Sequence, residues 1–578
     1  MGYIAIVDTG IDECSLAYSN VKKQYVLKDN GNSTSIKEER AKDCIGHGTE
    51  IANLIVKENP KAKLFILKAF DQFLSSVETL IAALSFLDKQ ADIDFINLSC
   101  GVTNINDINR LRQICDSLFT KNIILISAFD NNGALSFPAA FDSVIGIDVT
   151  TEKNINETFQ NEYVVNYFLK DKYYRVSGLN NKKEIIRGTS YACAEMTGKL
   201  SANYNTLEKR KRLSTLMKSS NKENELHTLN FKINKAIIFP YNKESDCIIR
   251  QKEKLNFEII GIFDEARKCR VGDIINGITI QDFSEINWDE NFDTIILSCT
   301  DELEEITGCP YKDIIIEKSL KYSKQIYSFE RIQNLTEADN KRIFFPQTNI
   351  VDSGWQNHGK MYKSSVPTVM VTGTNSKQGK FTLQTSLVDY FRKQNYTTGF
   401  LATEPSGYLF DADYVFPIGY NSTVNLNNDP YLYISTVNNA IRYIEEKNKD
   451  LIIAGSQSYS IQYDNSFLSQ YSLTQHFFFL GVDPDIYILT VNLFDETEYI
   501  IRTVNYLNSL SDGKVFAFVI SPFSIKETVT GIAMQLNDNT KEQIIQKKKE
   551  LIKYFSIPVY ELSEIEILGN KIINYFGE

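Results

Sequence analysis

Short apolar runs alternate with helical segments along the whole chain, and this alternation constrains the fold more than any other feature. An apolar run of about five residues followed by a helix is typical of a parallel strand buried between two helical layers. The sequence therefore predicts an α/β fold throughout, with parallel, doubly wound sheets. In the first part of the chain the runs are residues 3–7, 63–68, 95–98, 123–127 and 144–148.

The apolar runs fall into three blocks. A chain of 578 residues is too long for a single hydrophobic core. We expect a first domain at residues 1–220, a small Rossmann-like domain at 231–350 and a further α/β domain at 351–578. The segment 206–230 is first basic and then polar, and we interpret it as a closing helix and a linker. The strands expected in the later domains lie within 235–244, 257–264, 293–299, 324–330, 368–372, 450–455, 485–491, 515–520 and 557–562.

The composition disfavours several classes of function. A formal net charge of -11 argues against nonspecific binding to nucleic acids or anionic membranes, which needs a basic surface. No apolar run approaches the roughly 18 residues that cross a bilayer, and the first residues show no signal-peptide pattern. Nine cysteines are scattered without C-x-x-C spacing, which indicates reduced thiols rather than disulfides or a zinc site. We therefore expect a cytoplasmic protein without a metal site, and the oligomeric state stays open.

The stretch GTSYACAEMTG, residues 188–198, places Ser190 just before a helical pattern. A serine in this position is either a helix N-cap or a nucleophile. A nucleophilic serine needs a base, commonly imidazole, and a carboxylate that fixes the tautomer of that imidazole. The first block contains one histidine, His47 in GHGT, and its first apolar run is followed by Asp8 in VDTGID. Asp8 is the candidate carboxylate because ligand crevices form at the carboxyl ends of parallel strands.

The segments VDTGI, GHGT and GTSYACA, in this order, resemble the aspartate, histidine and serine motifs of the subtilisin-like serine peptidases. The resemblance covers roughly residues 1–205. It implies that Asp8 orients the imidazole, that His47 is the general base and acid, and that Ser190 is the nucleophile. It also implies that Asn131, in ISAFDNNG, donates to the oxyanion. The alternative is a pseudo-peptidase that keeps the fold and only binds peptide.

Residues around these motifs add to the resemblance and also depart from it. Ala194 stands where the family usually has proline, and Phe129 and Asp130 stand where small residues are expected. Asp130 could replace glycine by adopting a left-handed backbone conformation. Asn132 is the alternative oxyanion donor. The segment INLSCG resembles the family's substrate-pairing strand, which implies a peptide-binding segment made of Ser99, Cys100 and Gly101.

A glycine-rich loop, VTGTNSKQGKFT, lies between an apolar run and a helical pattern. Backbone N–H groups of such a loop bind phosphate, and a lysine neutralises its charge. The loop resembles the P-loop of dethiobiotin synthetase-like proteins, and residues 231–578 resemble the DUF1611 family. This implies a bound nucleotide, ATP or GTP, while Phe381 in place of a magnesium-binding Ser or Thr leaves a role for Mg²⁺ open. The expected nucleotide-binding residues are Gly373, Thr374, Asn375, Ser376, Gly379, Lys380 and Thr382.

Other polar residues follow strands of the third block. Glu404, Ser406, Gln457 and Ser458 are candidate ligand or metal contacts, and ordinary loop residues are the alternative. NLFD, residues 492–495, resembles the base-reading turn of GTPases but lacks its lysine. The second block has FPYNKE in place of G-x-G-x-x-G after its first strand, so we do not predict NAD binding.

Together these features predict a cytosolic serine endopeptidase with an accessory nucleotide-binding module. We expect its partners to be a nucleotide and a specific peptide, such as the precursor of a ribosomally made, bacteriocin-type natural product whose leader it removes. The alternative places the chemistry in the C-terminal half, as a nucleotide-dependent ligase, transferase or regulator. The first block would then be a peptide-binding platform.

Overall fold

The chain divides into two compact units in the computed structural model. The first comprises residues 1–222 and 355–362, and the second comprises 223–354 and 363–578. The structure describes residues 2–29, 34–70, 76–103, 108–131, 135–150, 165–204, 229–265, 270–333, 335, 341–348, 361–418, 430–464, 466, 471–521, 523–524, 534–535 and 541–577.

The first unit is built around an eight-stranded sheet in the order β3-β2-β4-β1-β5-β6-β7-β8. Its strands are parallel except for the antiparallel edge pair of β2 and β3. Strands β4 and β5 pair with β1 on its two sides. The carboxyl end of β1 is therefore a topological switch point, where a crevice forms. The strands are β1 (Tyr3–Asp8), β2 (Val21–Asp29), β3 (Thr34–Glu38), β4 (Leu64–Lys68), β5 (Ile93–Leu98), β6 (Ile124–Ala128), β7 (Ile145–Thr150), β8 (Tyr167–Lys170), β9 (Tyr174–Ser177) and β10 (Lys183–Ile186), and the helices are α1 (His47–Glu58), α2 (Val77–Asp88), α3 (Ile108–Thr120) and α4 (Thr189–Ala202).

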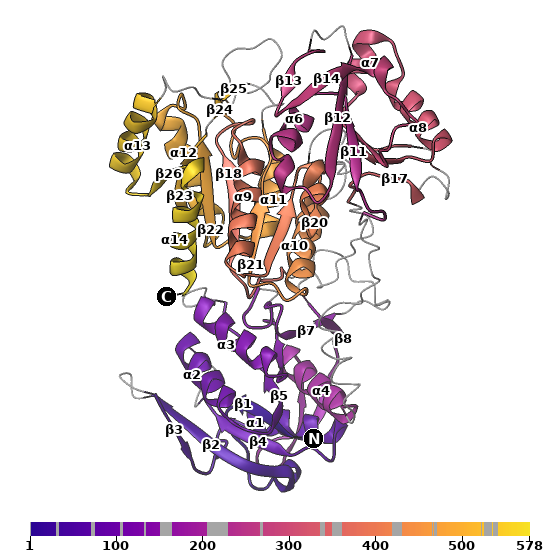
Figure 1. Ribbon diagram of the computed structural model, residues 1–578. Coiled ribbons are helices and arrows are strands. Elements are labelled where there is room, and N and C mark those ends of the chain that lie inside the picture. The colour runs from indigo at the N-terminus through magenta and orange to yellow at the C-terminus, as the bar shows by residue number, and fades with distance from the viewer. Residues whose placement is uncertain are drawn as a thin grey trace. The chain divides into compact units, whose positions relative to one another are not determined.

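Helices cover both faces of this sheet, as Figure 1 shows. Ile4 and Ile6 of β1 pack in a hydrophobic cluster with α1 and α4. Ala5 and Val7, which alternate with them, pack with α2 and α3. Burial of alternate residues on opposite faces explains why the run before Asp8 is apolar throughout.

The predicted α/β class and the predicted parallel sheet are confirmed in the first unit. Strands β1, β4, β5, β6 and β7 lie at the apolar runs that predicted them, each within about two residues. Strands β2 and β3 were not predicted, because they lie at an edge and carry mainly polar residues. Residues 206–228 of the predicted closing helix and linker, which spans 206–230, lie outside the described residues.

The second unit contains two seven-stranded sheets. Their orders are β13-β14-β12-β11-β15-β16-β17, the Rossmann-like sheet, and β20-β19-β21-β18-β22-β23-β26, the P-loop sheet. Elements of the first sheet are β11 (Lys235–Phe239), α6 (Lys243–Arg250), β12 (Glu258–Asp264), β13 (Ile274–Ile275), β14 (Ile278–Asp282), β15 (Thr294–Leu297), α7 (Asp301–Thr307), α8 (Tyr311–Lys321), β16 (Gln325–Ser328) and β17 (Ile343–Phe344). Elements of the second are β18 (Thr368–Gly373), α9 (Lys380–Lys393), β19 (Thr398–Ala402), β20 (Tyr414–Val415), α10 (Pro430–Glu445), β21 (Leu451–Gly455), α11 (Leu473–Val482), β22 (Ile486–Val491), α12 (Thr497–Leu510), β23 (Lys514–Ile520), α13 (Lys541–Phe555), β26 (Val559–Glu561) and α14 (Ile565–Gly577), beside a small ribbon of β24 (Phe523–Ser524) and β25 (Met534–Gln535).

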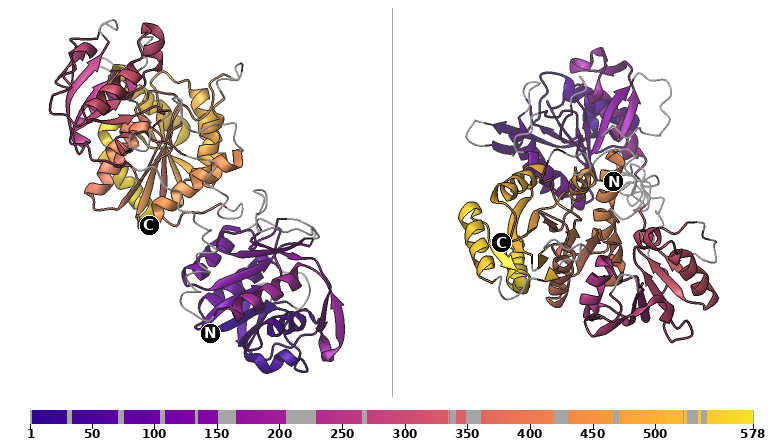
Figure 2. Two further views of the ribbon diagram at one scale, coloured as in Figure 1. Left: turned by 90° about the vertical axis from the view of Figure 1, so that its right-hand side faces the viewer. Right: turned by 90° about the horizontal axis from the view of Figure 1, so that it is seen from above.

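The two sheets of the second unit share one hydrophobic core. Helices α9 and α14 pack on one face of the P-loop sheet, and their cluster continues into β11 and α6 of the Rossmann-like sheet. Helices α10 to α13 pack on the other face, and Figure 2 shows helices on both sides of this sheet. Polar contacts reinforce the junction, since Thr385 of α9 donates to Gln251 at 2.6 Å and the Tyr327 hydroxyl donates to the Pro405 carbonyl at 2.6 Å. The two parts therefore form one structural body.

Among the helices that the structure describes, none combines the length and hydrophobicity that a membrane crossing requires.

Candidate functional site

Asp8 and His47 form a hydrogen-bonded pair at the carboxyl end of β1. The carboxylate is 3% exposed, and its Oδ1 atom accepts from the Thr9 backbone N–H at 2.8 Å. The same oxygen lies 2.8 Å from Nδ1 of His47, the first residue of α1. An ionised carboxylate can only accept, so Nδ1 carries the proton and Nε2 becomes the basic nitrogen.

A second buried carboxylate, Asp43, shapes the loop that presents His47. Its Oδ1 accepts from the backbone N–H groups of Ile45 and Gly46, and its Oδ2 accepts from the Thr49 N–H and hydroxyl. Burial alone would raise the pKa of Asp43, but these hydrogen bonds hold it below its ordinary value. The start of α1, and hence the position of the imidazole, depends on an ionised Asp43.

The charges around His47 favour its protonated form. Burial alone would lower the pKa of His47, but the negative charge and hydrogen bond of Asp8, with further charge from Glu50 and Asp43, raise it above its ordinary value. Glu50 is 6% exposed and accepts a hydrogen bond of 3.0 Å from the Tyr191 hydroxyl. A buried carboxylate that sequence reasoning did not identify therefore acts electrostatically on the imidazole.

Ser190 lies in the first turn of α4, next to α1. The N-cap of α4 is Gly188, with φ 138°, so Ser190 is inside the helix and is not its N-cap. Its hydroxyl donates to the Ser99 carbonyl at 2.8 Å. The following residue, Tyr191, places its ring 5.5 Å from the His47 ring, and α1 and α4 pack against each other. The fold thus brings the predicted nucleophile and base to neighbouring helix starts.

The Asn131 side chain is oriented by the residue before Ser190. Its Oδ1 atom accepts from the Thr189 backbone N–H at 2.9 Å and from the Thr189 hydroxyl at 3.1 Å. A backbone N–H can only donate, so the carbonyl end of the amide faces Thr189 and Nδ2 remains the donor end. This orientation suits the predicted role of Asn131 as an oxyanion donor. The alternative donor, Asn132, lies outside the described residues.

The departures from the family pattern are accommodated by packing. Phe129 is 6% exposed, and its ring fills the space beside Gly146. Ala194 is fully buried within an uninterrupted α4. Asp130 does not adopt the left-handed conformation that we considered, and its N–H donates to the Ser136 hydroxyl at 3.1 Å.

The predicted substrate segment follows β5 and is tied to the serine helix. The Ser99 hydroxyl donates to Asn97 Oδ1 at 2.9 Å, and Asn97 Nδ2 donates to the Thr197 hydroxyl of α4 at 2.9 Å. Cys100 is half-buried and Gly101 is exposed. Burial raises the pKa of the Cys100 thiol well above its ordinary value, which favours the neutral thiol over the nucleophilic thiolate.

The predicted P-loop joins β18 to α9. Gly373 ends the strand, and Gly379, with φ 73°, is the N-cap of a helix that begins at Lys380. A Cβ atom on Gly373 would lie 2.4 Å from the Thr490 hydroxyl and 2.7 Å from Gln378, so only glycine fits there. Lys380 is 7% exposed, and its ammonium group donates to the Asn375 carbonyl at 2.6 Å. This cradle of backbone groups with one buried cation fits a phosphate group.

Two residues outside the expected set hold the loop in shape. The Gln378 side chain is buried; it accepts from the Asn375 N–H at 3.0 Å and donates to the Thr374 hydroxyl at 2.8 Å. Asp495 of the NLFD turn accepts from that same Thr374 hydroxyl. Asp495 thus ties the loop to the end of β22. Within the loop, the Ser376 N–H donates to the Asn375 side chain at 2.8 Å.

Charges from both sheets of the second unit meet at the P-loop. Burial lowers the pKa of Lys380 to about 8, against an opposing effect of Glu404. Burial, followed by the charge of Glu244, raises the pKa of Glu404, which also contacts Gln457. Burial and the charge of Lys243 lower the pKa of Lys377 in the loop. Lys243 and Glu244 belong to α6, so the Rossmann-like part contributes charge to the phosphate cradle.

The remaining candidates near the loop have different environments. Phe381 is 8% exposed and packs against Phe400 and Phe410, which makes it a core residue. Thr382 contacts the Cys247 thiol of α6. Ser406 is buried in the short helix Pro405–Phe410, and Ser458 is exposed with φ 54°. Of the four strand-end candidates, Glu404 and Gln457 are therefore the two that lie at the cradle.

Family models match both halves of the chain. The subtilase family matches residues 2–233, and the P-loop domain of DUF1611, a domain of unknown function, matches residues 356–565. The N-terminal part of the chain thus matches the subtilase family, and the C-terminal part matches the DUF1611 P-loop domain. The predicted resemblance to these two families is thereby confirmed, and with it a serine-protease-type fold at the N-terminal end.

Individual relatives are distant. The minor extracellular protease Epr of Bacillus subtilis is 29% identical over 169 residues, which are 26% of this chain and 24% of that protein. The chain spans about a quarter or less of the curated relatives that it matches. A DUF1611 protein from Anabaena variabilis is 12% identical and aligns over 59% of this chain and all of that one, with a TM-score of 0.41. The epidermin leader peptide processing protease of Staphylococcus aureus is 16% identical, over 39% of this chain and 71% of that one, with a TM-score of 0.33.

The first prediction concerns pH and the subtilase domain. Only a neutral imidazole can accept a proton, so with His47 as the predicted base and Ser190 as the predicted nucleophile, the rate of labelling by a fluorophosphonate should rise as pH passes through the raised pKa of His47. Glu50→Gln removes a charge that favours the imidazolium form, and the midpoint should move to lower pH. The control is Glu58→Gln, on the same helix, which should leave the midpoint in place. An unmoved midpoint in Glu50→Gln would contradict the electrostatic role of Glu50.

The second prediction concerns pH and the P-loop domain. Only protonated Lys380 attracts phosphate, and its pKa is lowered to about 8. Affinity for ATP, measured by calorimetry, should be retained below that pH and fall by about tenfold per pH unit above it, because binding then requires proton uptake. Lys380→Arg keeps its charge over this range and should flatten the profile. A wild-type affinity that is unchanged up to pH 10 would contradict the account.

Proposed function

We propose that the N-terminal domain is an active serine endopeptidase. The observation that carries this proposal is the hydrogen bond between His47 and Asp8, with Ser190 in the first turn of the adjacent helix. His47 Nε2 would take the proton of the Ser190 hydroxyl as Ser190 Oγ attacks the scissile carbonyl. The hydroxyl, which donates to the Ser99 carbonyl, would turn to His47 when substrate binds.

The developing oxyanion would be stabilised by two donors. These are Nδ2 of Asn131, whose other end Thr189 holds, and the backbone N–H of Ser190 near the start of α4. Protonated His47 would then donate to the leaving amine, which departs and leaves an acyl group on Ser190. Water, deprotonated by His47, would hydrolyse that ester and restore the serine.

We further propose that the substrate is one specific peptide inside the cell, such as the leader segment of a ribosomally made precursor. Cys14 and Cys44 are exposed free thiols, which suits a reducing compartment. A protease in that compartment needs a narrow substrate range, because broad activity would degrade the host's own proteins. Fusion to a second, ligand-binding module fits a dedicated biosynthetic role better than general proteolysis.

The P-loop domain is proposed to bind ATP or GTP. The loop N–H groups and Lys380 would hold the phosphates, and Glu404 and Gln457 lie beside them. Bound nucleotide would supply a phosphoryl or nucleotidyl group, or a conformational signal, while the residues described here bind and orient it.

The third prediction tests the peptidase. A fluorophosphonate should label the wild-type protein and not Ser190→Ala, while Ser19→Ala, at an exposed serine of the same domain, should label normally. Asn131→Leu should keep the fold and lower peptide turnover by about 10²–10³-fold, since it removes one oxyanion donor. Absence of labelling in the wild type would overturn the proposal.

Substrate range is tested separately by incubating the protein with short peptides encoded beside its gene and with a tryptic digest of whole-cell protein. One cleavage in one encoded peptide, absent in Ser190→Ala, would support leader removal. Efficient cleavage at many sites in the digest would refute it.

The fourth prediction tests nucleotide binding. Millimolar ATP or GTP should raise the melting temperature of the wild type and leave that of Lys380→Ala unchanged, because a ligand that binds only the folded state stabilises it. Lys393→Ala, at the exposed C-terminal end of α9, is the matched control and should respond as the wild type does. An equal response in wild type and Lys380→Ala would remove the nucleotide from the account.

A further inference from the structure

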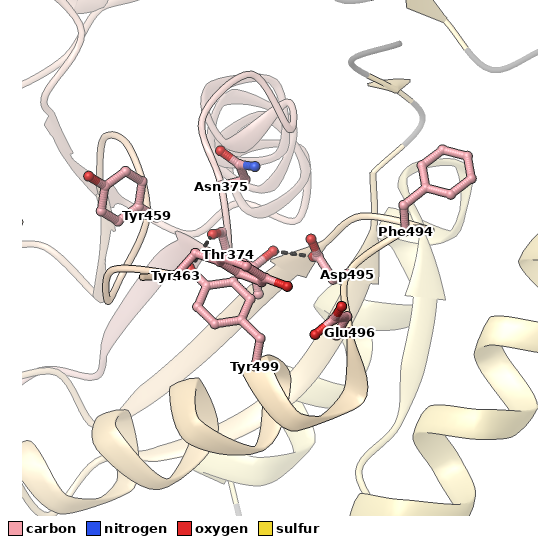
Figure 3. A pocket seen from close by; sticks show the side chains of 8 residues that line it. All are labelled: Thr374, Asn375, Tyr459, Tyr463, Phe494, Asp495, Glu496 and Tyr499. Carbon is pink, nitrogen blue, oxygen red and sulfur yellow. Dashed lines mark hydrogen bonds between the residues drawn. The ribbon is translucent and has the colours of Figure 1, made fainter. Parts of the chain in front are cut away.

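A pocket of about 370 Å³ lies directly beside the P-loop. Figure 3 shows Thr374 and Asn375 of the loop at the pocket, with Tyr459 on one side, Phe494 on the other, and Tyr463 and Tyr499 between them. A cavity of this size is within the range of small-molecule sites, and four aromatic side chains line it. Asn375 also holds the ammonium group of Lys380 through its carbonyl, so the pocket and the phosphate cradle share a wall.

Tyr499 and Tyr463 line the pocket and are held by contacts with neighbouring residues. Tyr499 is 6% exposed, and its hydroxyl lies 2.7 Å from the carbonyl oxygens of both Thr374 and Ile461. The Tyr463 ring packs edge-on against it, with centroids 5.0 Å apart and planes at 70°. The Tyr463 hydroxyl is held by Glu496. These contacts fix the orientation of the two rings, which together present an aromatic surface to the pocket.

Two of the four aromatic side chains at the pocket are largely exposed to solvent and so contribute little to the hydrophobic core. Phe494 is 65% exposed and Tyr463 is 55% exposed. Phe494 stands at the apex of the NLFD turn, which is fixed by a hydrogen bond of 3.1 Å from its own N–H to the Asn492 side chain. Single exposed aromatic residues are common, but two at one pocket beside a phosphate-binding loop indicate a stacking site for a planar group.

The charges of the pocket indicate which part of a ligand it takes. Asp495 and Glu496 line it, so an anionic phosphate is repelled from this side and attracted to Lys380 on the other. Asp495 is also engaged, since it accepts from the Thr374 hydroxyl and from the Asn492 N–H at 2.6 Å. The carboxylate of the NLFD turn is therefore occupied with the loop, and binding has to come from stacking.

We propose that this pocket holds the base of a nucleotide whose phosphates lie in the P-loop, stacked on Phe494 and Tyr463. The inference rests on the proposed nucleotide binding and adds the location and chemistry of base recognition. A neutral, flat heterocycle can stack on the aromatic rings without the repulsion that an anion would meet from the two carboxylates, while its phosphates reach Lys380 past Asn375. An anionic second substrate in the same pocket would meet two carboxylates.

The experiment compares ATP with inorganic tripolyphosphate, which has the phosphates but no base, by calorimetric titration of the full-length protein in one magnesium-containing buffer. The wild type should bind ATP more tightly than tripolyphosphate. Phe494→Ala and Tyr463→Ala should each weaken ATP binding by about five- to a hundredfold and leave tripolyphosphate binding unchanged. Phe494→Tyr, which keeps an aromatic ring, and Tyr554→Ala, at a 59% exposed tyrosine on α13, should match the wild type.

Each other outcome overturns the inference. Equal weakening of ATP and tripolyphosphate would mean that Phe494 and Tyr463 act through the loop. Unchanged ATP binding in both alanine variants would mean that the base lies elsewhere or that the pocket holds a second substrate. Binding of neither probe to the wild type would refute nucleotide binding itself, whereas the first two results would leave it standing.

Discussion

The hydrogen bond between His47 and Asp8 depends on a very close approach between the end of β1 and the start of α1. A Cβ atom on Gly48 would lie 2.4 Å from the Gly10 carbonyl oxygen, and one on Gly10 would lie 2.3 Å from the Ala41 carbonyl oxygen. Gly10 and Gly46 also have φ values of 113° and 108°. Glycine is the residue that tolerates both the contact and the backbone angle. The glycines of the VDTG and GHG segments are therefore sterically required if the Asp8 carboxylate of β1 is to reach the His47 imidazole of α1.

The sequence predicted those parts of the structure that follow from apolar runs and from close-packed glycines. Buried strands such as β1 and β18 are apolar on both faces and were expected, whereas the polar edge strand β3 was not. Asp43 stands four residues before His47, ahead of a helix start, and that position could have identified it as a loop-capping carboxylate. Glu50 follows His47 by three residues, the spacing of neighbours on one helix face.

Other features depend on tertiary packing that spacing does not encode. The buried Gln378 side chain accepts a hydrogen bond of 3.2 Å from the hydroxyl of Thr490 on β22, which is far away in sequence. Lys243 and Glu244 reach the P-loop because α6 and α9 share a core, although they belong to a different sheet. The orientation of the Asn131 amide could not be predicted from the sequence, because it depends on the hydrogen bond from the Thr189 N–H. In both units, parallel strand ends and glycine-bounded helix starts place the reactive or anion-binding groups, and the surrounding charges are then set by neighbouring elements.

The most direct test of the account is a crystal structure of the protein after reaction with a fluorophosphonate. We expect one phosphonyl group, bonded to Ser190 Oγ, with its oxygen accepting hydrogen bonds from Asn131 Nδ2 and from the Ser190 N–H. His47 should still be hydrogen-bonded to Asp8. A phosphonyl oxygen directed away from Asn131, or a group attached to any other residue, would contradict the assignment of the serine, the base and the oxyanion donor as one catalytic site.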